Sequence, residues 1–129
     1  LAAYTCALFF NTYQLVPKVA INIGSEIPIG CGMGSSAALI LAILSTLHAV
    51  MELPINDHIL YEMALIAECR QHGVSSGIDL RTCLHGKSWL FADQSLTPLK
   101  FSQELPMYWY HSGQPNETTG QCVHHARKQ

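Results

Sequence analysis

The most informative segment of the chain is Pro28-Ile29-Gly30-Cys31-Gly32-Met33-Gly34-Ser35-Ser36-Ala37-Ala38, which follows an extended stretch and leads directly into an apolar helix. Its alternating glycines permit positive φ angles and let backbone N–H groups approach a ligand closely. The free amides and the positive dipole end of the following helix attract an anion. This segment, called the glycine loop below, therefore predicts a phosphate-binding turn.

Two hydroxyl side chains, Ser35 and Ser36, follow the last glycine at the start of the expected helix. They can cap the helix or reach a phosphate and its metal ion. The loop lacks the lysine of a Walker loop, and its glycine spacing departs from the dinucleotide-binding fingerprint. A tight strand-to-helix turn without a ligand is the alternative interpretation.

The whole chain has 129 residues, of which 49% are hydrophobic, and this is enough apolar material for one packed domain and too little for two. Its 7 Lys and Arg residues against 9 Asp and Glu residues give a formal charge of -2, without a basic run. This balance argues against a nucleic-acid or anionic-membrane surface. A small-molecule substrate is the partner that we expect.

The five cysteines are scattered, at positions 6, 31, 69, 83 and 122, and show neither metal-ligand spacing nor a dense disulfide pattern. We expect reduced thiols in a cytoplasmic protein. The seven histidines are interpreted as ordinary core or surface residues rather than metal ligands. The longest apolar run, Ala37 to Leu44, is far shorter than the ~20 residues that cross a bilayer.

Helices and strands are expected to mix without a regular strand-helix-strand rhythm, which favours an α+β fold over a doubly wound parallel sheet. Apolar periodicity and capping residues predict the helices, and alternation bounded by turn residues predicts the strands. The predicted helices cover 1–15, Gly34 to before Pro54, Asn56 or Asp57 to Gln71, a short segment ending near Gly86, and a last one from about Thr118; the predicted strands cover 18–25, 88–92, 98–101 and 106–111.

The glycine loop, with its pattern Pro-x-Gly-x-Gly-Met-Gly-Ser-Ser-Ala-Ala, resembles the phosphate-binding motif of the GHMP kinases, which usually carry leucine at the position of Met33. The resemblance implies that the loop wraps the phosphates of ATP, that Ser35 contacts a phosphate and that Ser36 ligates Mg2+. The ATP-binding residues that it implies are Gly30, Gly32, Met33, Gly34, Ser35, Ser36 and Ala37.

A second segment, Glu68-Cys69-Arg70-Gln71-His72-Gly73-Val74-Ser75-Ser76-Gly77-Ile78-Asp79, resembles the part of the mevalonate kinases in which a helical Glu precedes a Ser-Gly-x-Asp turn. The resemblance implies that Glu68 binds Mg2+, that His72 lies on the substrate side and that Asp79 is the catalytic carboxylate facing the alcohol. Phosphoryl transfer to an alcohol needs such a carboxylate and a metal ion. The alternatives are a solvated helix face for Glu68 and a helix N-cap for Asp79.

Two departures from this pattern concern the substrate more than the kinase chemistry. Val74-Ser75 stands where those enzymes usually have Asn-Pro, and Leu80-Arg81 follows the Asp. Arg81 can pair with Asp79 or with an anionic group of the substrate, because guanidinium suits planar anions.

A third segment, His111 to Gly120, resembles a turn that bacterial and archaeal mevalonate kinases write as His-Thr-Gly-x-Pro-x-x-Thr-Thr. Thr118 and Thr119 are the substrate-binding candidates of this turn. Capping of the following helix by these threonines is the alternative.

Together the resemblances imply one GHMP kinase ATP-binding domain over residues 1–129, part of a two-layer α/β sandwich and incomplete at both ends, with 106–129 as a candidate start of the C-terminal subdomain. They imply ATP- and Mg2+-dependent phosphorylation of a small-molecule hydroxyl, with mevalonate as the preferred acceptor. The alternatives are a phosphomevalonate or sugar kinase of the same family, or a nucleotide-binding module without turnover. A homodimer is left open.

Overall fold

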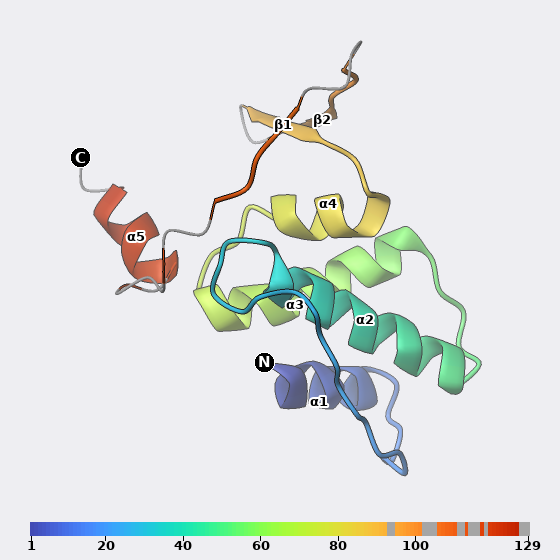
Figure 1. The fold of residues 1–129 in the computed structure, drawn as a ribbon. Helices are drawn as coiled ribbons and strands as arrows, with labels where there is room; N and C mark the ends of the chain where they lie inside the picture. The colour runs from blue at the N-terminus through green and yellow to red at the C-terminus, as the bar shows by residue number, and fades with distance from the viewer. Residues whose placement is uncertain (93–94, 102–105, 111–112, 114–116, 118, 127–129) are drawn as a thin grey trace.

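The computed structural model describes residues 1–92, 95–101, 106–110, 113, 117 and 119–126. Its centre is helix α2, Ser35–Val50, which contacts three other helices (Figure 1). These are α1, Ala2–Thr12, α3, Asp57–His72, and α4, Ile78–His85. All four helices lie where the sequence predicted helices.

The remaining elements follow α4 along the chain. β1, Trp89–Ala92, and β2, Ser95–Pro98, form an antiparallel hairpin in which Trp89 pairs with Pro98. Helix α5, Thr119–Ala126, stands apart from the four-helix cluster (Figure 1). The described residues thus combine helices with a small sheet, which confirms the α+β class, while the two-layer sandwich stays a prediction. No described helix has the length and apolar character that a membrane span requires.

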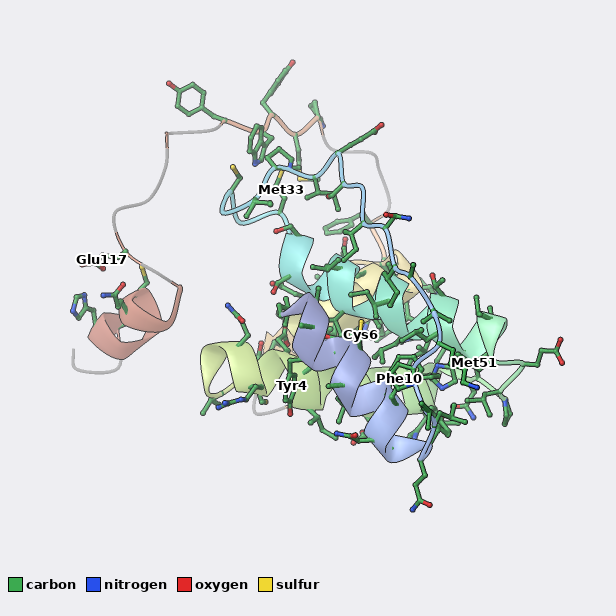
Figure 2. The ribbon with its side chains drawn as sticks, turned by 90° about the horizontal axis from the view of Figure 1, so that it is seen from below. Tyr4, Cys6, Phe10, Met33, Met51 and Glu117 are labelled. Carbon is green, nitrogen blue, oxygen red and sulfur yellow. The ribbon has the colours of Figure 1, made fainter. Side chains whose placement is uncertain are left out.

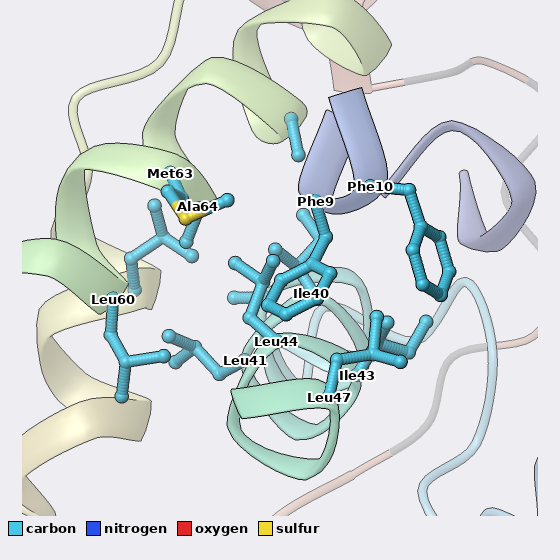
Figure 3. Packing of buried hydrophobic residues seen from close by; sticks show 13 residues of the cluster. Phe9, Phe10, Ile40, Leu41, Ile43, Leu44, Leu47, Leu60, Met63 and Ala64 are labelled. Carbon is cyan, nitrogen blue, oxygen red and sulfur yellow. The ribbon is translucent and has the colours of Figure 1, made fainter. Parts of the chain in front are cut away.

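The core lies where α2 packs between α1 and α3 (Figure 3). Ile40, Leu44 and Leu47 follow one another at helical spacing on α2 and are 0%, 0% and 3% exposed. Burying each such side chain contributes about 1.5–3 kcal/mol relative to leaving it in water. The buried apolar residues are Phe9, Phe10, Ala37, Ile40, Leu41, Ile43, Leu44, Leu47, Leu60, Met63, Ala64, Ala67 and Leu80.

The helix boundaries have local causes. Helix α3 begins after Asn56, whose Oδ1 accepts a hydrogen bond from the Ile59 N–H at 2.9 Å, and ends at Gly73, which has a φ of 82°. Both the cap and the glycine stop were predicted. Helix α1 is shorter than the predicted 1–15, because Gln14 has a φ of 53° and turns the chain after Thr12.

His48 is a fully buried histidine that joins α1 to α2. Its Nδ1 lies 2.8 Å from the Leu44 carbonyl oxygen and its Nε2 lies 2.8 Å from the Tyr13 hydroxyl. A carbonyl only accepts hydrogen bonds, so Nδ1 carries the proton and the Tyr13 hydroxyl donates to Nε2. Both ring nitrogens are therefore satisfied, and the prediction of an ordinary core histidine is confirmed for this residue.

The predicted strand at 18–25 is wrong, because the structure has irregular extended chain there. The side chains of Ile21 and Ile23 are 41% and 50% exposed. Period-2 alternation indicates two faces of different polarity, but a strand also needs a hydrogen-bonding neighbour. No backbone–backbone hydrogen bond joins 18–25 to another described residue.

Of the three strand predictions nearer the C-terminus, only the first is confirmed at its predicted position. The strand at 88–92 is confirmed by β1, but that at 98–101 is displaced, since β2 ends at Pro98. The hairpin pairs the residues up to and including Pro98, and among the described residues one further bond, from the Leu99 N–H to the Ser88 carbonyl, continues the ladder. Residues 106–110 form no strand, and 111 lies outside the described residues. The last helix is confirmed by α5.

Candidate functional site

The glycine loop has left-handed backbone at each of its glycines. The φ angle is 77° at Gly30, 69° at Gly32 and 65° at Gly34, which confirms the predicted conformation. Met33, between the last two glycines, is 45% exposed and lies at the outer turn of the loop (Figure 2). The loop therefore presents its backbone to solvent at the start of α2.

Helix α2 begins without a side-chain cap. Gly34 occupies the N-cap position, and the first helical hydrogen bond runs from the Ala38 N–H to the Gly34 carbonyl at 2.9 Å. The amides of residues 35–37 consequently have no acceptor within the helix. The hydroxyls of Ser35 and Ser36 form no hydrogen bond with a described residue, so the capping alternative is wrong. Amides and hydroxyls together form a donor group that suits an anion.

Helix α4 packs against the start of α2 through Cys83. The Cys83 Sγ lies 4.0 Å from the carbonyl oxygen of Gly34. Asp79 precedes Cys83 by four residues and so lies on the same face of α4, one turn earlier. The face of α4 that carries Asp79 is thus turned toward the glycine loop. Sequence reasoning missed Cys83, although its four-residue spacing from Asp79 was a usable signal.

Glu68 is a buried carboxylate on α3, with 5% of its surface exposed. The hydroxyl of Ser75 donates a hydrogen bond to Glu68 Oε2. The alternative of a solvated helix face is therefore wrong. Burying a carboxylate costs free energy unless it is hydrogen-bonded or paired with a cation. Glu68 therefore needs a compensating partner.

Asp79 is an exposed carboxylate in the first turn of α4. Gly77, with a φ of 70°, is the N-cap of that helix, and no side chain caps it. The alternative in which Asp79 caps the helix is therefore wrong. Among the described residues Asp79 forms neither a hydrogen bond nor an ion pair, which leaves its carboxylate accessible to a substrate.

The Cys83 thiol is influenced electrostatically by both carboxylates. Burial raises the pKa of Cys83, and the negative charges of Asp79 and Glu68 raise it further, because thiolate is disfavoured beside carboxylates. The same thiol lies against the carbonyl of Gly34. Neither acid forms an ion pair with a described basic residue. The surplus of negative charge beside a phosphate-type loop suits a divalent cation.

The donor set fits Mg2+ bound together with a phosphate. Within the described ranges, no three His, Cys, Asp or Glu side chains gather into a site that would hold a metal unaided. Mg2+ in nucleotide sites commonly takes one or two protein ligands and completes its shell with phosphate oxygens and water. Two groups have the right chemistry for those protein ligands, namely the buried Glu68 carboxylate and the Ser36 hydroxyl, which forms no hydrogen bond with a described residue.

Comparison with known proteins identifies the family of this chain. Residues 1–87 match the family model for the GHMP kinases N terminal domain. The chain belongs to the GHMP kinase family. It is 37% identical over 92 residues to a mevalonate kinase of Archaeoglobus fulgidus, which covers 71% of the chain and 32% of the relative.

Other relatives of this GHMP kinase chain carry two different names. A mevalonate kinase of Pyrococcus horikoshii is 29% identical over 100 residues, 78% of the chain and 30% of the relative. A putative 4-diphosphocytidyl-2-C-methyl-D-erythritol kinase of Staphylococcus aureus is 29% identical over 115 residues, 88% of the chain and 37% of the relative. The chain thus spans about a third of the length of these relatives. No solved structure gave a significant match.

Arg81 is held away from Asp79 in this GHMP kinase chain. Its guanidinium carbon lies 4.1 Å from the ring centroid of Tyr61, over the ring face. Residues two positions apart on a helix point to nearly opposite sides, so Arg81 and Asp79 diverge. The pairing with Asp79 that the sequence allowed is absent among the described residues, and Arg81 stacks on α3 instead.

The other substrate-binding candidates lie at helix ends or outside the described residues. His72 is the last residue of α3, and its side chain is not described. Thr118 lies outside the described residues, and Thr119 begins α5, which stands apart from the glycine loop (Figure 1). Their roles stay predictions.

A pocket of about 410 Å³ lies on the other side of α2. The extended segment 21–27 forms one wall, and Ser35, Ala38, Leu39 and Ala42 belong to the opposite wall. Its lining includes neither Glu68 nor Asp79, so the pocket is separate from the carboxylate side of the loop.

Proposed function

We propose that this chain supplies the phosphate loop and both carboxylates of an ATP- and Mg2+-dependent kinase that phosphorylates the hydroxyl of mevalonate. The observation that carries the proposal is the packing of α4 against the start of α2, where the Cys83 Sγ lies 4.0 Å from the Gly34 carbonyl oxygen and Asp79 lies one turn earlier on the same face of α4. The names of the archaeal relatives and the Glu68-to-Asp79 segment support mevalonate as the acceptor. The scattered free cysteines support a cytoplasmic location.

The glycine loop is the proposed site of the ATP phosphates. Backbone amides of residues 35–37 lack helical acceptors, and the N-terminal end of α2 adds a favourable dipole. The exposed backbone at Gly30 and Gly32 allows close approach of a phosphate without a side chain in the way. This loop would bind and orient the triphosphate.

Asp79 is the proposed catalytic carboxylate. The alcohol oxygen attacks the γ-phosphorus, and its proton passes to the Asp79 carboxylate. The bond between the γ-phosphorus and the bridging oxygen breaks, and ADP leaves. The exposed position of Asp79 and its lack of a described partner leave both oxygens available to the alcohol.

Glu68 and Ser36 are the proposed protein ligands of Mg2+. Bound Mg2+ would neutralise negative charge on the phosphates during transfer.

The proposed substrate-binding residues are Arg81, His72, Thr118 and Thr119. We also propose that 1–129 forms part of the ATP-binding domain and that 106–129 begins the C-terminal subdomain; the family match over 1–87 supports the first of these.

A second acceptor class is favoured by one comparison. The name of the Staphylococcus aureus relative refers to a different small alcohol, a 4-diphosphocytidyl-methylerythritol. A panel of mevalonate, phosphomevalonate, galactose and this compound separates the possibilities. Coupled detection of ADP release by the full-length gene product is the measurement.

We expect mevalonate to give the highest kcat/KM in this panel. A higher kcat/KM for another alcohol would overturn mevalonate as the acceptor but would still support kinase activity. If the protein binds Mg-ADP tightly but releases no ADP with any alcohol of the panel, the kinase activity is overturned in favour of a nucleotide-binding module.

A further inference from the structure

A chain of two hydrogen bonds links Glu68 to the start of α4. The Ser75 hydroxyl donates to Glu68 Oε2, and the Gly77 N–H donates to the Ser75 oxygen at 2.9 Å. Ser75 lies in the connection between α3 and α4, seven residues after Glu68. A single hydroxyl therefore spans the two elements that carry the acidic residues.

The direction of each bond is fixed by chemistry. A backbone N–H can only donate, so the Ser75 oxygen must accept from Gly77, and its one proton is then free for the carboxylate. Serine and threonine provide both functions on one atom. Alanine provides neither, and proline, which the mevalonate kinase pattern carries at this position, has no hydroxyl.

The bond orients the Glu68 carboxylate. Only 5% of Glu68 is exposed, so a hydrogen bond from Ser75 offsets part of the cost of burying its charge. It engages Oε2, while Oε1 forms no hydrogen bond with a described residue. Holding one oxygen fixes the direction in which the other can meet a cation.

The same hydroxyl also holds the start of α4. Gly77 is the N-cap of that helix, and Asp79 follows two residues later. The Tyr61 hydroxyl of α3 lies close against Gly77, so this turn is held from two sides. A change at Ser75 consequently acts on Glu68 directly and on Asp79 through the helix start.

We propose that Ser75 is a positioning residue that aligns the Glu68 carboxylate for Mg2+ and ties that alignment to the Asp79 end of α4. The proposal rests on the proposed function, because it takes Glu68 as a metal ligand. It also gives a role to one of the positions at which this chain departs from the mevalonate kinase pattern.

The test compares Ser75→Ala, Ser75→Thr and the neighbouring control Ser76→Ala in the full-length gene product. Ser76 is exposed and its oxygen accepts only a long bond, 3.4 Å from the Ile78 nitrogen, so it matches Ser75 in type but lacks the carboxylate contact. Calorimetric titration with ADP, in MgCl2 and in EDTA, separates the metal-dependent affinity from the affinity of the loop alone. The melting temperature of each variant shows whether it is folded.

We expect Ser75→Ala to weaken the ADP affinity in MgCl2 by about tenfold or more, the size typical for residues that orient a metal ligand. Affinity in EDTA should change by less than about twofold, since the glycine loop is untouched. Ser75→Thr should restore most of the loss, and Ser76→Ala should behave as the unmodified protein. Unchanged affinity of Ser75→Ala in MgCl2, or failure of threonine to rescue, overturns the positioning role.

Glu68→Gln separates this proposal from the function on which it rests. If Glu68→Gln removes the effect of MgCl2 while Ser75→Ala does not, only the positioning role is wrong. If Glu68→Gln leaves the effect of MgCl2 intact, Glu68 is not a metal ligand and both proposals for this carboxylate are wrong.

Discussion

At the glycine loop, backbone conformation rather than lack of space is what demands glycine. A Cβ added at Gly32 would meet nothing within 4 Å, and one added at Gly34 would lie at an ordinary 3.6 Å from the Cys83 Sγ. Both residues, however, have φ angles near +65° to +69°. A side chain there costs about 1–2 kcal/mol, and more if it is β-branched.

Gly32→Val should therefore bend the loop away from its phosphate-binding conformation. We expect the affinity for ADP in EDTA, measured by calorimetry, to fall at least about tenfold. Gly24→Val is the matched control, because Gly24 has open space and no positive φ. Equal ADP affinities for the two variants would show that the glycine loop does not bind the phosphates.

Asp79→Asn should lower kcat by at least about 100-fold in the full-length gene product, because the amide cannot take the proton of the alcohol. The affinity for Mg-ADP should change little, and so should the melting temperature, since Asp79 is exposed and does not cap α4. A near-normal kcat in the steady-state assay would return Asp79 to a structural role.

The same variant has a second readout that does not depend on turnover. Carboxylate charge raises the pKa of Cys83, so loss of the Asp79 charge moves that pKa down and enlarges the thiolate fraction at a given pH. Alkylation of Cys83 by iodoacetamide at pH 8, followed by mass spectrometry, should therefore be faster in Asp79→Asn. Cys122, on the distant α5, is the internal reference.

Single residues differed in how far the sequence could predict them. The positive φ of Gly32 follows from local sterics, and so it was predictable. The burial of Glu68 and the contact of Cys83 with Gly34 depend on how α3 and α4 pack on α2, and no local pattern encodes that packing. Ser75 was visible only as a departure from a family pattern, without the bond that explains it.

At the scale of elements, the α3–α4 junction sets the position of Asp79. A Cβ at Gly77 would collide with the Tyr61 hydroxyl, and the φ of 70° disfavours a side chain in addition. Gly86, at the other end of α4, has a φ of 59° and open space. The two glycines therefore share a backbone conformation and differ in crowding.

Gly77→Ala should destabilise the protein by at least ~1 kcal/mol more than Gly86→Ala, because only the first forces α4 and Tyr61 apart. Urea unfolding of both variants measures the difference. Tyr61→Phe, combined with Gly77→Ala, removes the nearest clashing atom, so the double variant should lose less stability than the two single losses added together. Additive losses would show that crowding by Tyr61 does not matter.

Helices were more predictable than strands, for a physical reason. The cap at Asn56 and the stop at Gly73 act within a few residues, so α3 was predicted nearly to its ends. The segment 18–25 carries the alternation of a strand, but pairing is non-local and no described strand lies beside it. Its polarity pattern was correctly recognised, and its secondary structure was not.

At the scale of the whole molecule, the chain covers 32% of its Archaeoglobus fulgidus relative and leaves much apolar surface exposed. Ile29 is 80% exposed, Met107 87% and Tyr110 88%. A continuous run of exposed apolar side chains, as at residues 107–110, commonly marks a surface that contacts other protein segments. The described residues thus carry the groups of the proposed site, while large apolar side chains elsewhere in the chain stay exposed.

The last prediction is that residues 1–129 alone do not turn over mevalonate. Phosphoryl transfer depends mainly on positioning, and a misplacement of about 1 Å can cost ~100-fold in rate. The chain spans about a third of the relatives that carry the kinase name, and Asp79 is exposed, so we expect the described residues to leave the alcohol without an enclosed pocket. A coupled ADP-release assay on the isolated chain, beside the Archaeoglobus fulgidus mevalonate kinase at equal concentration, tests this, with circular dichroism to confirm that the helices have formed. Gel filtration of the same sample should show self-association through the exposed apolar surface. A mevalonate-dependent rate comparable to that of the relative would prove that these residues already contain the whole site.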